Sequence, residues 1–313
     1  MNLFPGQRIF IVIPVHNRRV ITLGCLEQLS RLGVLNWATP IVIDDGSADG
    51  TSAAVREKFP DAILLQGDGS LWWTGAIAAG MKEAMNRNGT VIIWLNDDSY
   101  PRAGTLEMLV SETLRNKCIS VGQTIAPPGC YGGMTKTAFG MQTIFCPPGQ
   151  KISCDSMAGN CVVIESEIVT HIGYPDSRFI PQVGADVDYG LRATSKGISI
   201  LIVGDALCDN RPSDNPLSHS WLFDDQSFRE RWKGVRSIKS EMYPPAKWRL
   251  YTRHWGLLGI ILFALPYIKL FAYHAVKAVV PQKVLRSLFA SRSATLQATK
   301  HTVKTNASSN NQS

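Results

Sequence analysis

The sequence predicts an α/β protein built on a doubly wound, mostly parallel sheet. Within the first hundred residues, short apolar runs alternate with segments of helical periodicity. Each apolar run is followed at once by a polar or glycine-rich cluster. Buried strands that alternate with helices are typical of a parallel sheet covered on both faces. Because ligands bind beyond the carboxyl ends of such strands, we expect the four clusters to converge on one cleft.

The individual elements follow from apolar periodicity and from the turn residues between segments. The run IFIVIP predicts the first strand, and VIIWL predicts the fourth. A later stretch rich in Gly, Pro, Cys and Thr predicts an insertion that contains a hairpin. In all, we expect strands at 9–14, 40–45, 62–66 and 91–95, helices at 20–32, 51–58 and 74–86, the insertion at 118–155, a strand at 157–165 and a helix at 186–195.

Charge divides the 313-residue chain into two parts. Residues 1–226 carry 17 Lys and Arg against 23 Asp and Glu, whereas residues 227–313 carry 15 against 2. Such a division predicts an acidic catalytic body and a basic segment that meets something anionic. We expect a catalytic domain at 1–226 (a nucleotide-binding half at about 1–117 and an acceptor-side half at about 118–226), a basic helical region at 227–290 and a disordered tail at 291–313.

The basic region contains an uncharged apolar stretch at 255–268, which is shorter than the roughly 20 residues that span a bilayer. Pro266 and Lys269 also disfavour a spanning helix. Aromatic residues and interspersed cations favour a helix that lies in the interface of an anionic membrane. A helical hairpin packed on the protein's own body, and a true span, are the alternatives.

The cysteines and the first residues indicate a cytoplasmic setting. The seven cysteines form no CxxC pair, and residues 1–20 show no signal peptide. We therefore expect reduced thiols, with one disulfide among Cys130, Cys146 and Cys154 as the minor alternative. The predicted location is peripheral, at the cytoplasmic face of the inner membrane, or cytoplasmic if the tail only packs on the body.

Asn96-Asp97-Asp98 follows the fourth predicted strand directly. Carboxylates at a strand end suit a hard cation such as Mg²⁺ or Mn²⁺, which also binds phosphate oxygens and keeps water ligands. The alternative is an acidic turn or helix cap. Its position beside three other strand-end clusters favours the metal site.

Two loops carry a resemblance to a known family. Pro14-Val15-His16-Asn17 follows the first strand, and Asp44-Asp45-Gly46-Ser47-Ala48-Asp49-Gly50-Thr51 follows the second. Both resemble loops of the family 2 glycosyltransferases with the GT-A fold, in a rhamnosyltransferase-like bacterial branch. Asn96-Asp97-Asp98 then matches the metal-binding DxD position, with Asn96 in place of the first Asp. The resemblance implies that Asp98 is the direct ligand.

The resemblance also assigns a donor site for a nucleotide-diphosphate sugar. The glycine-rich turn from Gly67 to Gly75 resembles the loop before the donor-pocket helix, and its backbone N–H groups suit phosphate; the alternative is a plain turn with packed tryptophans. His219 matches a position where relatives place a metal or diphosphate ligand, although a lone His is more often structural. The implied donor-binding residues are Pro14, Val15, Asn17, Asp44, Asp45, Asp68, Trp73, Gly75, Asn96 and Asp97.

On the acceptor side, the segment from Gly184 to Arg192 resembles the family's ED-x-D-L-x-x-R motif, with Ala185 in place of the acidic first residue. Asp186 then takes the place of the catalytic base, which deprotonates the acceptor hydroxyl in an inverting transfer. An N-cap role for Asp186 is the alternative. Gly159, Asn160 and Asp188 are implied on the acceptor side, where Asp188 and Arg192 also hold the helix.

Other functions fit the motifs less well. A dehydrogenase needs GxGxxG after the first strand, and a sugar-nucleotide pyrophosphorylase needs a basic glycine-rich loop there; neither is present. A catalytically inactive, membrane-bound scaffold of this fold remains the alternative, because Ala185 and Asn96 replace acidic residues. We expect a glycan or lipid-linked acceptor and no nucleic-acid partner. By family analogy, a deoxyhexose such as rhamnose is a plausible donor sugar, in polysaccharide biosynthesis.

Overall fold

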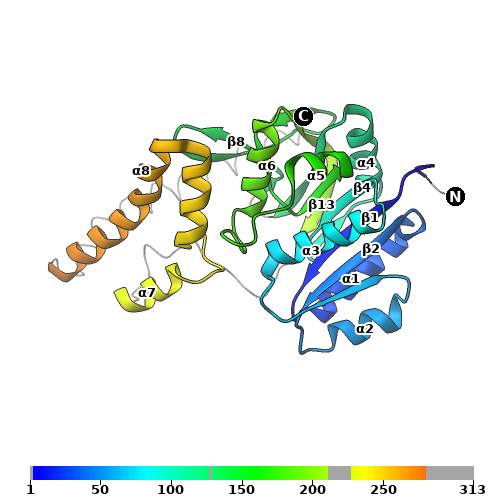
Figure 1. Ribbon diagram of the computed structural model, residues 1–313, viewed down its shortest axis with the longest axis horizontal. Coiled ribbons are helices and arrows are strands. Elements are labelled where there is room, and N and C mark those ends of the chain that lie inside the picture. The colour runs from blue at the N-terminus through cyan, green and yellow to red at the C-terminus, as the bar shows by residue number, and fades with distance from the viewer. Residues whose placement is uncertain (1–2, 127–128, 211–226, 280–313) are drawn as a thin grey trace, which may run out of the picture. The chain divides into compact units, whose positions relative to one another are not determined.

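The computed structural model describes residues 3–126, 129–210 and 227–279 (Figure 1). A mixed, curled central sheet has the strand order β10-β13-β6-β12-β4-β1-β2-β3. Helices cover both of its faces, as predicted for a doubly wound α/β fold. His219 and the predicted tail at 291–313 lie outside the described residues.

The parallel half of the sheet confirms the first four predicted strands. Strands β1, β2 and β3 pair in parallel, and β4 pairs in parallel with the other side of β1. All five residues of β4 are buried, which explains its continuous apolar run. The strands are β1 (Ile9–Val15), β2 (Ala38–Asp45), β3 (Ile63–Gly67) and β4 (Val91–Leu95).

Helices α1 (Arg19–Arg31) and α4 (Thr105–Asn116) pack on one face of this sheet, and α3 (Trp72–Asn86) packs on the other. A side chain at Gly80 would lie 2.4 Å from Val12 Cγ1. This contact shows how closely α3 approaches β1 and β2. Helix α2 (Thr51–Lys58) matches its predicted bounds, and a short 3₁₀ turn, η1 (Val34–Asn36), follows α1.

The second half of the sheet differs from the prediction. The stretch predicted as an insertion supplies a central strand, because β6 pairs in parallel with β13. The predicted hairpin exists as β8 and β9, which form a small sheet with β11. The elements are β5 (Ser99–Pro101), β6 (Ile119–Ala126), β7 (Gly129–Tyr131), β8 (Gly133–Thr137), β9 (Gly140–Ile144), β10 (Lys151–Cys154), β11 (Ser156–Met157) and β13 (Ile200–Asn210).

The strand predicted at 157–165 is two strands. The chain leaves β11 and re-enters the central sheet as β12 (Cys161–Glu165), which runs antiparallel between β4 and β6. The break at 158–160 lies where the predicted acceptor residues are. Helix α5 (Ser166–Ile172) follows, and α6 (Ala185–Ser195) matches the predicted helix closely. All seven cysteines are free, and Cys130, Cys146 and Cys154 form no disulfide with one another.

The C-terminal region contains α7 (Phe228–Val235) and α8 (Pro244–Val279). Gly256 interrupts α8 with non-helical backbone angles (φ 56°, ψ −130°), which only glycine adopts readily. The chain divides into two compact units within α8, at 1–260 and 261–313. One described helix, at 244–276, is long and apolar enough to cross a membrane, by length and composition alone.

Candidate active site

The first two strand-end loops are tied together by Asn17. Its backbone has φ 53°, in the left-handed region that Asn tolerates better than most residues. The Asn17 side-chain oxygen accepts a hydrogen bond from the Ala48 N–H at 2.7 Å, so its amide nitrogen faces His16 Nε2 at 2.9 Å. His16 Nδ1 lies 2.6 Å from the Asp45 carbonyl oxygen. With these partners, Nδ1 faces a carbonyl acceptor and Nε2 faces an amide donor.

Asp45 shapes the glycine-rich loop. Its carboxylate is 5% exposed and accepts backbone hydrogen bonds from Gly69 (2.8 Å), Leu71 (3.2 Å) and Trp72 (2.9 Å). Trp72 has φ 55°, which is strained for a bulky residue. The three N–H groups therefore offset the strain and hold the start of α3 beside the ends of β1 and β2. Both carboxylate oxygens of Asp45 are used within the protein.

The neighbouring acidic residues differ in exposure. Asp44 is 2% exposed and accepts hydrogen bonds from the Ser47 N–H (2.9 Å) and the Ser52 hydroxyl. Asp68 is exposed, and hydrogen bonds from the Ser70 hydroxyl and N–H lower its pKa. The remaining predicted donor residues lie on the same strand ends and on α3: Pro14 is partly buried, Val15 is 4% exposed and Gly75 is buried.

Asn96 joins the donor-side and acceptor-side elements. Its side-chain oxygen accepts a hydrogen bond from Trp73 Nε1 at 2.8 Å, and its amide nitrogen donates to the Asn160 side-chain oxygen at 3.1 Å. Asn160 in turn donates to Tyr131 Oη (3.1 Å) and Thr124 Oγ1 (3.3 Å). An Asp at position 96 accepts but does not donate when ionised. The Asn96 amide therefore makes a hydrogen bond to Asn160 that an ionised Asp at this position could not make.

Arg18 holds the two carboxylates that follow Asn96. One nitrogen of its guanidinium lies 2.7 Å from Asp97 Oδ1, and the other lies 2.7 Å from Asp98 Oδ2. Asp97 is 1% exposed, and its second oxygen accepts from the Thr22 hydroxyl at 3.0 Å. Burial raises the pKa of Asp97 to about 7, although the Arg18 charge opposes the shift. Asp98 is the more accessible carboxylate, with 18% of its side chain exposed.

The residues at this position fit a divalent cation that takes one ligand from the protein. Among the described residues, no group of three or more His, Cys, Asp or Glu side chains is arranged to hold a metal ion. Mg²⁺ and Mn²⁺ accept one or two carboxylates together with phosphate oxygens and water. Among the described residues, Arg18 pairs with Asp98 through Oδ2, which leaves Oδ1 at the more exposed edge of the cluster, whereas both oxygens of Asp97 are paired, one with Arg18 and one with Thr22.

Asp186 is the second residue of α6, whose N-cap is Gly184 with a φ of 90°. Its Oδ2 accepts from the Gly159 N–H at 2.8 Å, and its Oδ1 accepts from the Val187 N–H at 2.8 Å. A side chain at Gly159 would lie 2.6 Å from the Trp73 ring and 3.1 Å from Asp186 Cβ. Burial raises the pKa of the Asp186 carboxyl.

These contacts form a continuous polar patch. Asp186 binds Gly159, Gly159 packs on Trp73, and Trp73 binds Asn96 next to Asp97 and Asp98. The structure thus brings the predicted donor, metal and acceptor positions to one edge of the sheet. Asp188 faces another group of partners: it is fully buried and paired with Arg192, Arg253 and His254. An acceptor contact by Asp188 stays a prediction.

Ala185 is fully buried, which explains the missing acidic residue at this position. It packs with Ile180 and with Ala246 of α8. A carboxylate there would lose water without gaining a partner, at a substantial cost. The start of α8 covers this turn, and this packing accounts for Ala185 in place of an acidic residue.

Three residues of the patch were not predicted from the sequence: Arg18, Thr124 and Tyr131. The sequence signal for Arg18 is its place directly after Asn17 in the first loop. Tyr131 and Thr124 lie in the stretch predicted as an insertion, and no sequence pattern indicates their contact with Asn160.

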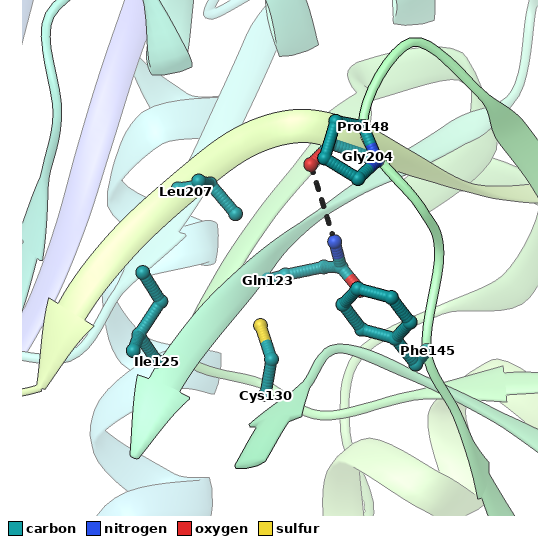
Figure 2. Close-up of a pocket in the computed structure, with 7 residues that line it drawn as sticks. All are labelled: Gln123, Ile125, Cys130, Phe145, Pro148, Gly204 and Leu207. Atoms are coloured by element: carbon teal, nitrogen blue, oxygen red, sulfur yellow. Dashed lines mark hydrogen bonds between the residues drawn. The ribbon is translucent and has the colours of Figure 1, made fainter. Parts of the chain in front are cut away.

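A separate open cavity of about 550 Å³ lies between β6, β7 and β13 (Figure 2). Its walls are mostly apolar, which does not suit a diphosphate. Gln123 is the main polar group and donates to the Gly204 carbonyl at 3.2 Å. No predicted site residue is among the residues that line it, which are Gln123, Ile125, Cys130, Phe145, Pro148, Gly204 and Leu207.

Comparisons with known proteins agree with this architecture. Residues 10–163 match the sequence model of the family described as Glycosyl transferase family 2. No curated protein sequence matches the chain. A mannosyltransferase, PcManGT from Pyrobaculum calidifontis, solved with GDP-Man and Mn²⁺, is 17% identical with a TM-score of 0.52; the match covers 93% of this chain and 82% of that one.

GalNAc-T7, solved with UDP, GalNAc and Mn²⁺, is 15% identical with a TM-score of 0.56. The match covers 65% of this chain and spans 44% of the length of GalNAc-T7. At such low identity the structural matches establish the fold, and the sequence match establishes the domain. Residues 10–163 therefore carry a glycosyl transferase family 2 domain, which indicates a glycosyltransferase, and the fold of the chain is GT-A-like.

Proposed function

We propose that this glycosyltransferase moves a sugar, with inversion, from a nucleotide-diphosphate sugar to a hydroxyl of a glycan or lipid-linked acceptor. The observation that carries the proposal is the patch in which Asp186 binds Gly159, Gly159 packs on Trp73 and Trp73 binds Asn96. Asp186 has both oxygens oriented by backbone N–H groups, yet no cation pairs with it among the described residues. A carboxylate without a counter-ion remains available to accept a proton.

Asp186 acts as the general base in this proposal. It takes the proton of the acceptor hydroxyl while the hydroxyl oxygen attacks the anomeric carbon of the donor sugar. The new glycosidic bond forms as the bond between that carbon and the diphosphate breaks. The nucleoside diphosphate leaves with the bonding electron pair. The raised pKa of Asp186 makes it a stronger base than an ordinary surface carboxylate.

Asp98 is the proposed ligand of the divalent cation, with His219 as a further candidate in the segment outside the described residues. When bound, the cation stabilises the negative charge of the leaving diphosphate. Arg18 and Thr22 keep Asp97 in place beside Asp98. The solved structures with Mn²⁺ support a divalent metal of this kind, either Mn²⁺ or Mg²⁺.

The donor loops hold the nucleotide in this proposal. The backbone around Asn17 and Ser47 and the loop shaped by Asp45 flank the ends of β1 and β2. The N–H groups of Gly69, Leu71 and Trp72 donate to Asp45, so in this proposal the glycine-rich turn shapes the donor site and does not hold phosphate through those groups. A donor panel of UDP-, GDP- and dTDP-sugars, with and without Mn²⁺, tests the proposal by thermal shift and nucleotide release. Wild-type protein that neither binds nor hydrolyses any of them contradicts it.

Exposed apolar side chains of α8, from Leu257 to Ile268, support an interaction with an anionic membrane at the cytoplasmic face. Leu257 is 84% exposed, and Ile261 and Ile268 are 56% and 59% exposed. The proposed partner suits a lipid-linked acceptor in polysaccharide biosynthesis, for which a deoxyhexose donor is one candidate. Leu257→Glu with Ile261→Glu is expected to reduce flotation with vesicles that contain anionic lipid. Unchanged flotation contradicts the membrane proposal.

A further inference from the structure

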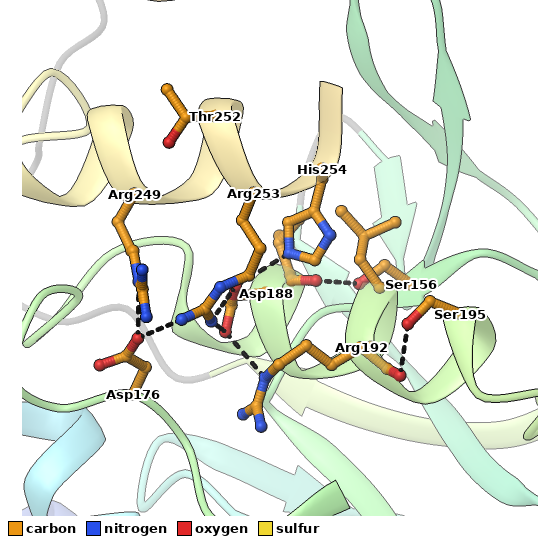
Figure 3. A network of polar contacts seen from close by, with 12 residues as sticks. Ser156, Asp176, Asp188, Arg192, Ser195, Arg249, Thr252, Arg253 and His254 are labelled. Carbon is orange, nitrogen blue, oxygen red and sulfur yellow. Dashed lines mark hydrogen bonds and ion pairs between the residues drawn. The ribbon is translucent and has the colours of Figure 1, made fainter. Parts of the chain in front are cut away.

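A buried charge network joins the first half of α8 to the helix that carries Asp186 (Figure 3). At its centre, the Asp188 carboxylate is fully buried. It accepts hydrogen bonds from Arg192 Nε at 3.0 Å and from one Arg253 nitrogen at 2.7 and 2.8 Å. His254 Nε2 lies 2.9 Å from Asp188 Oδ1. Burial acts to raise the pKa of Asp188, but His254 and the two arginines outweigh it and lower the pKa.

Arg253 also reaches a second carboxylate. Its other terminal nitrogen lies 2.6 Å from Asp176 Oδ2, which Arg249 approaches at 3.1 Å. Arg192 donates in addition to the backbone carbonyls of Ile172 and Tyr174. One guanidinium of α8 therefore links the loop before α6 to the first turn of α6.

Without α8, this part of the protein has an imbalance of charge. Asp176 and Asp188 supply two carboxylates, and Arg192 supplies one cation from the same segment. Further positive charge comes from Arg249 and Arg253, which lie 65 to 77 residues along the chain from the carboxylates that they contact. A buried carboxylate without a partner is strongly unfavourable. The first turn of α6 thus depends on α8 for its electrostatic balance.

The same turn sets the position of Asp186. Asp188 is two residues away, and the backbone carbonyl between them, at Val187, accepts from the Ser156 hydroxyl at 2.9 Å. A side chain at Gly190 would lie 2.3 Å from Ser156 Oγ, so α6 is already in close contact on that side. The turn is held between β11 on one side and the cations of α8 on the other.

We infer that Arg253 and His254 are positioning residues for Asp186, acting through Asp188. The first half of α8 is then part of the catalytic machinery as well as the start of the apolar helix. The inference rests on the proposed function, because Asp186 is the proposed base. If the inference holds, loss of Arg253 displaces Asp186 from the acceptor hydroxyl while the donor site stays intact.

The test uses the full chain with Arg253→Gln, Arg253→Lys and His254→Gln, assayed at temperatures well below each variant's unfolding transition. A displacement of about 1 Å in an active site can reduce a rate about 10²-fold. We expect Arg253→Gln to lower kcat for transfer by about 10- to 100-fold. Donor KM is expected to change by less than about twofold. Arg253→Lys keeps the charge but not both contacts, so it retains part of the rate. His254→Gln has the smallest effect.

Arg87→Gln is the matched control, because it removes an Arg–Glu pair at the C-terminal end of α3. It is expected to leave kcat and donor KM unchanged. A folded Arg253→Gln variant with wild-type kcat overturns the inference. So does a variant in which only donor KM changes.

A double-mutant cycle separates positioning from a merely structural role. If Arg253 acts through Asp186, Arg253→Gln lowers the residual rate of Asp186→Asn by less than about twofold, because the base is already absent. Additive losses in the double variant overturn the inference. If wild-type protein turns over no donor, the proposed function fails instead. Hydrogen exchange at 184–192 then still tests the coupling: Arg253→Gln must raise it, and unchanged exchange overturns the link to α6.

Discussion

The donor-side loops and the acceptor-side helix differ in what holds them. On the donor side, Asp44 and Asp45 accept hydrogen bonds from backbone and hydroxyl groups within about 27 residues of themselves. On the acceptor side, Asp188 is held by Arg253 and His254, more than sixty residues away. The two carboxylates of the proposed donor loops are therefore held by nearer parts of the chain, whereas Asp188 on the proposed acceptor side is held by the C-terminal extension.

The difference has a consequence for function. A locally fixed donor site can keep its shape when the rest of the chain varies. An acceptor side held by α8 can respond to whatever α8 contacts, because the same helix continues into exposed apolar residues such as Leu257. Substitutions on the two sides are therefore expected to change different kinetic parameters.

The largest expected effect comes from Asp186→Asn. The amide keeps the size of the side chain but cannot accept the acceptor proton, so transfer should fall by about 10²- to 10⁴-fold. Donor binding should change little, because Asp186 contacts Gly159 and Val187 and not the donor loops. Steady-state kinetics with separate donor titration checks this. A variant with near-wild-type transfer removes Asp186 from the role of base.

Asp45→Asn is the matching change on the donor side. The new amide nitrogen cannot accept the hydrogen bond that a carboxylate oxygen of Asp45 accepts, so a buried backbone N–H loses its partner. We therefore expect a loss of about 1.5–3 kcal/mol in the free energy of unfolding. Donor KM should rise, because the loop that begins α3 loses its shape. Asp61→Asn is the control, since Asp61 is exposed and is not among the predicted site residues. Equal effects of the two changes would remove the special role of Asp45.

Asn96→Asp tests the link between the two sides. Although it restores an acidic first residue, the side chain can no longer donate to Asn160, and it adds a negative charge beside Asp97. We expect a loss of about 1–3 kcal/mol in unfolding free energy, measured by denaturant titration. The control Asn88→Asp lies at an exposed turn and should be near neutral. A more stable Asn96→Asp protein contradicts the proposed role of the amide.

The pH dependence of transfer is the smallest of these effects. Asp186 must be ionised to act as a base, and burial raises its pKa. The rate should therefore fall as pH decreases, with a midpoint above the usual carboxyl pKa of about 3.9. A profile of kcat/KM against pH checks the direction. Asp186→Asn should lose this acidic limb, and a variant that keeps it assigns the limb to another group.

Much of the parallel half was predictable from the sequence. The continuous apolar run of β4 and the turn residues after β2 indicate both the strands and the clusters that follow them. The resemblance of the two loops then added Asn96 and Asp98 to the same predicted site, and in the structure Arg18 of the first loop contacts Asp98. These signals are local, because each depends on residues close together in the chain.

The second half was less predictable for physical reasons. β6 and β13 are adjacent in the sheet but about eighty residues apart, and no local pattern encodes such a pairing. The break between β11 and β12 occurs where Gly159 packs on Trp73, a contact between distant segments. The pairing of Asp188 with Arg253 is equally non-local. Arg18 lay inside a recognised loop, yet only the fold shows that it bridges Asp97 and Asp98.

The most direct test of the proposed chemistry is the anomeric configuration of the transferred sugar, read by NMR on the first product formed from a defined donor. An attack by an acceptor hydroxyl that Asp186 deprotonates predicts inversion relative to the donor, and no such product from Asp186→Asn. A product with retained configuration, formed by the wild-type protein, would contradict the account.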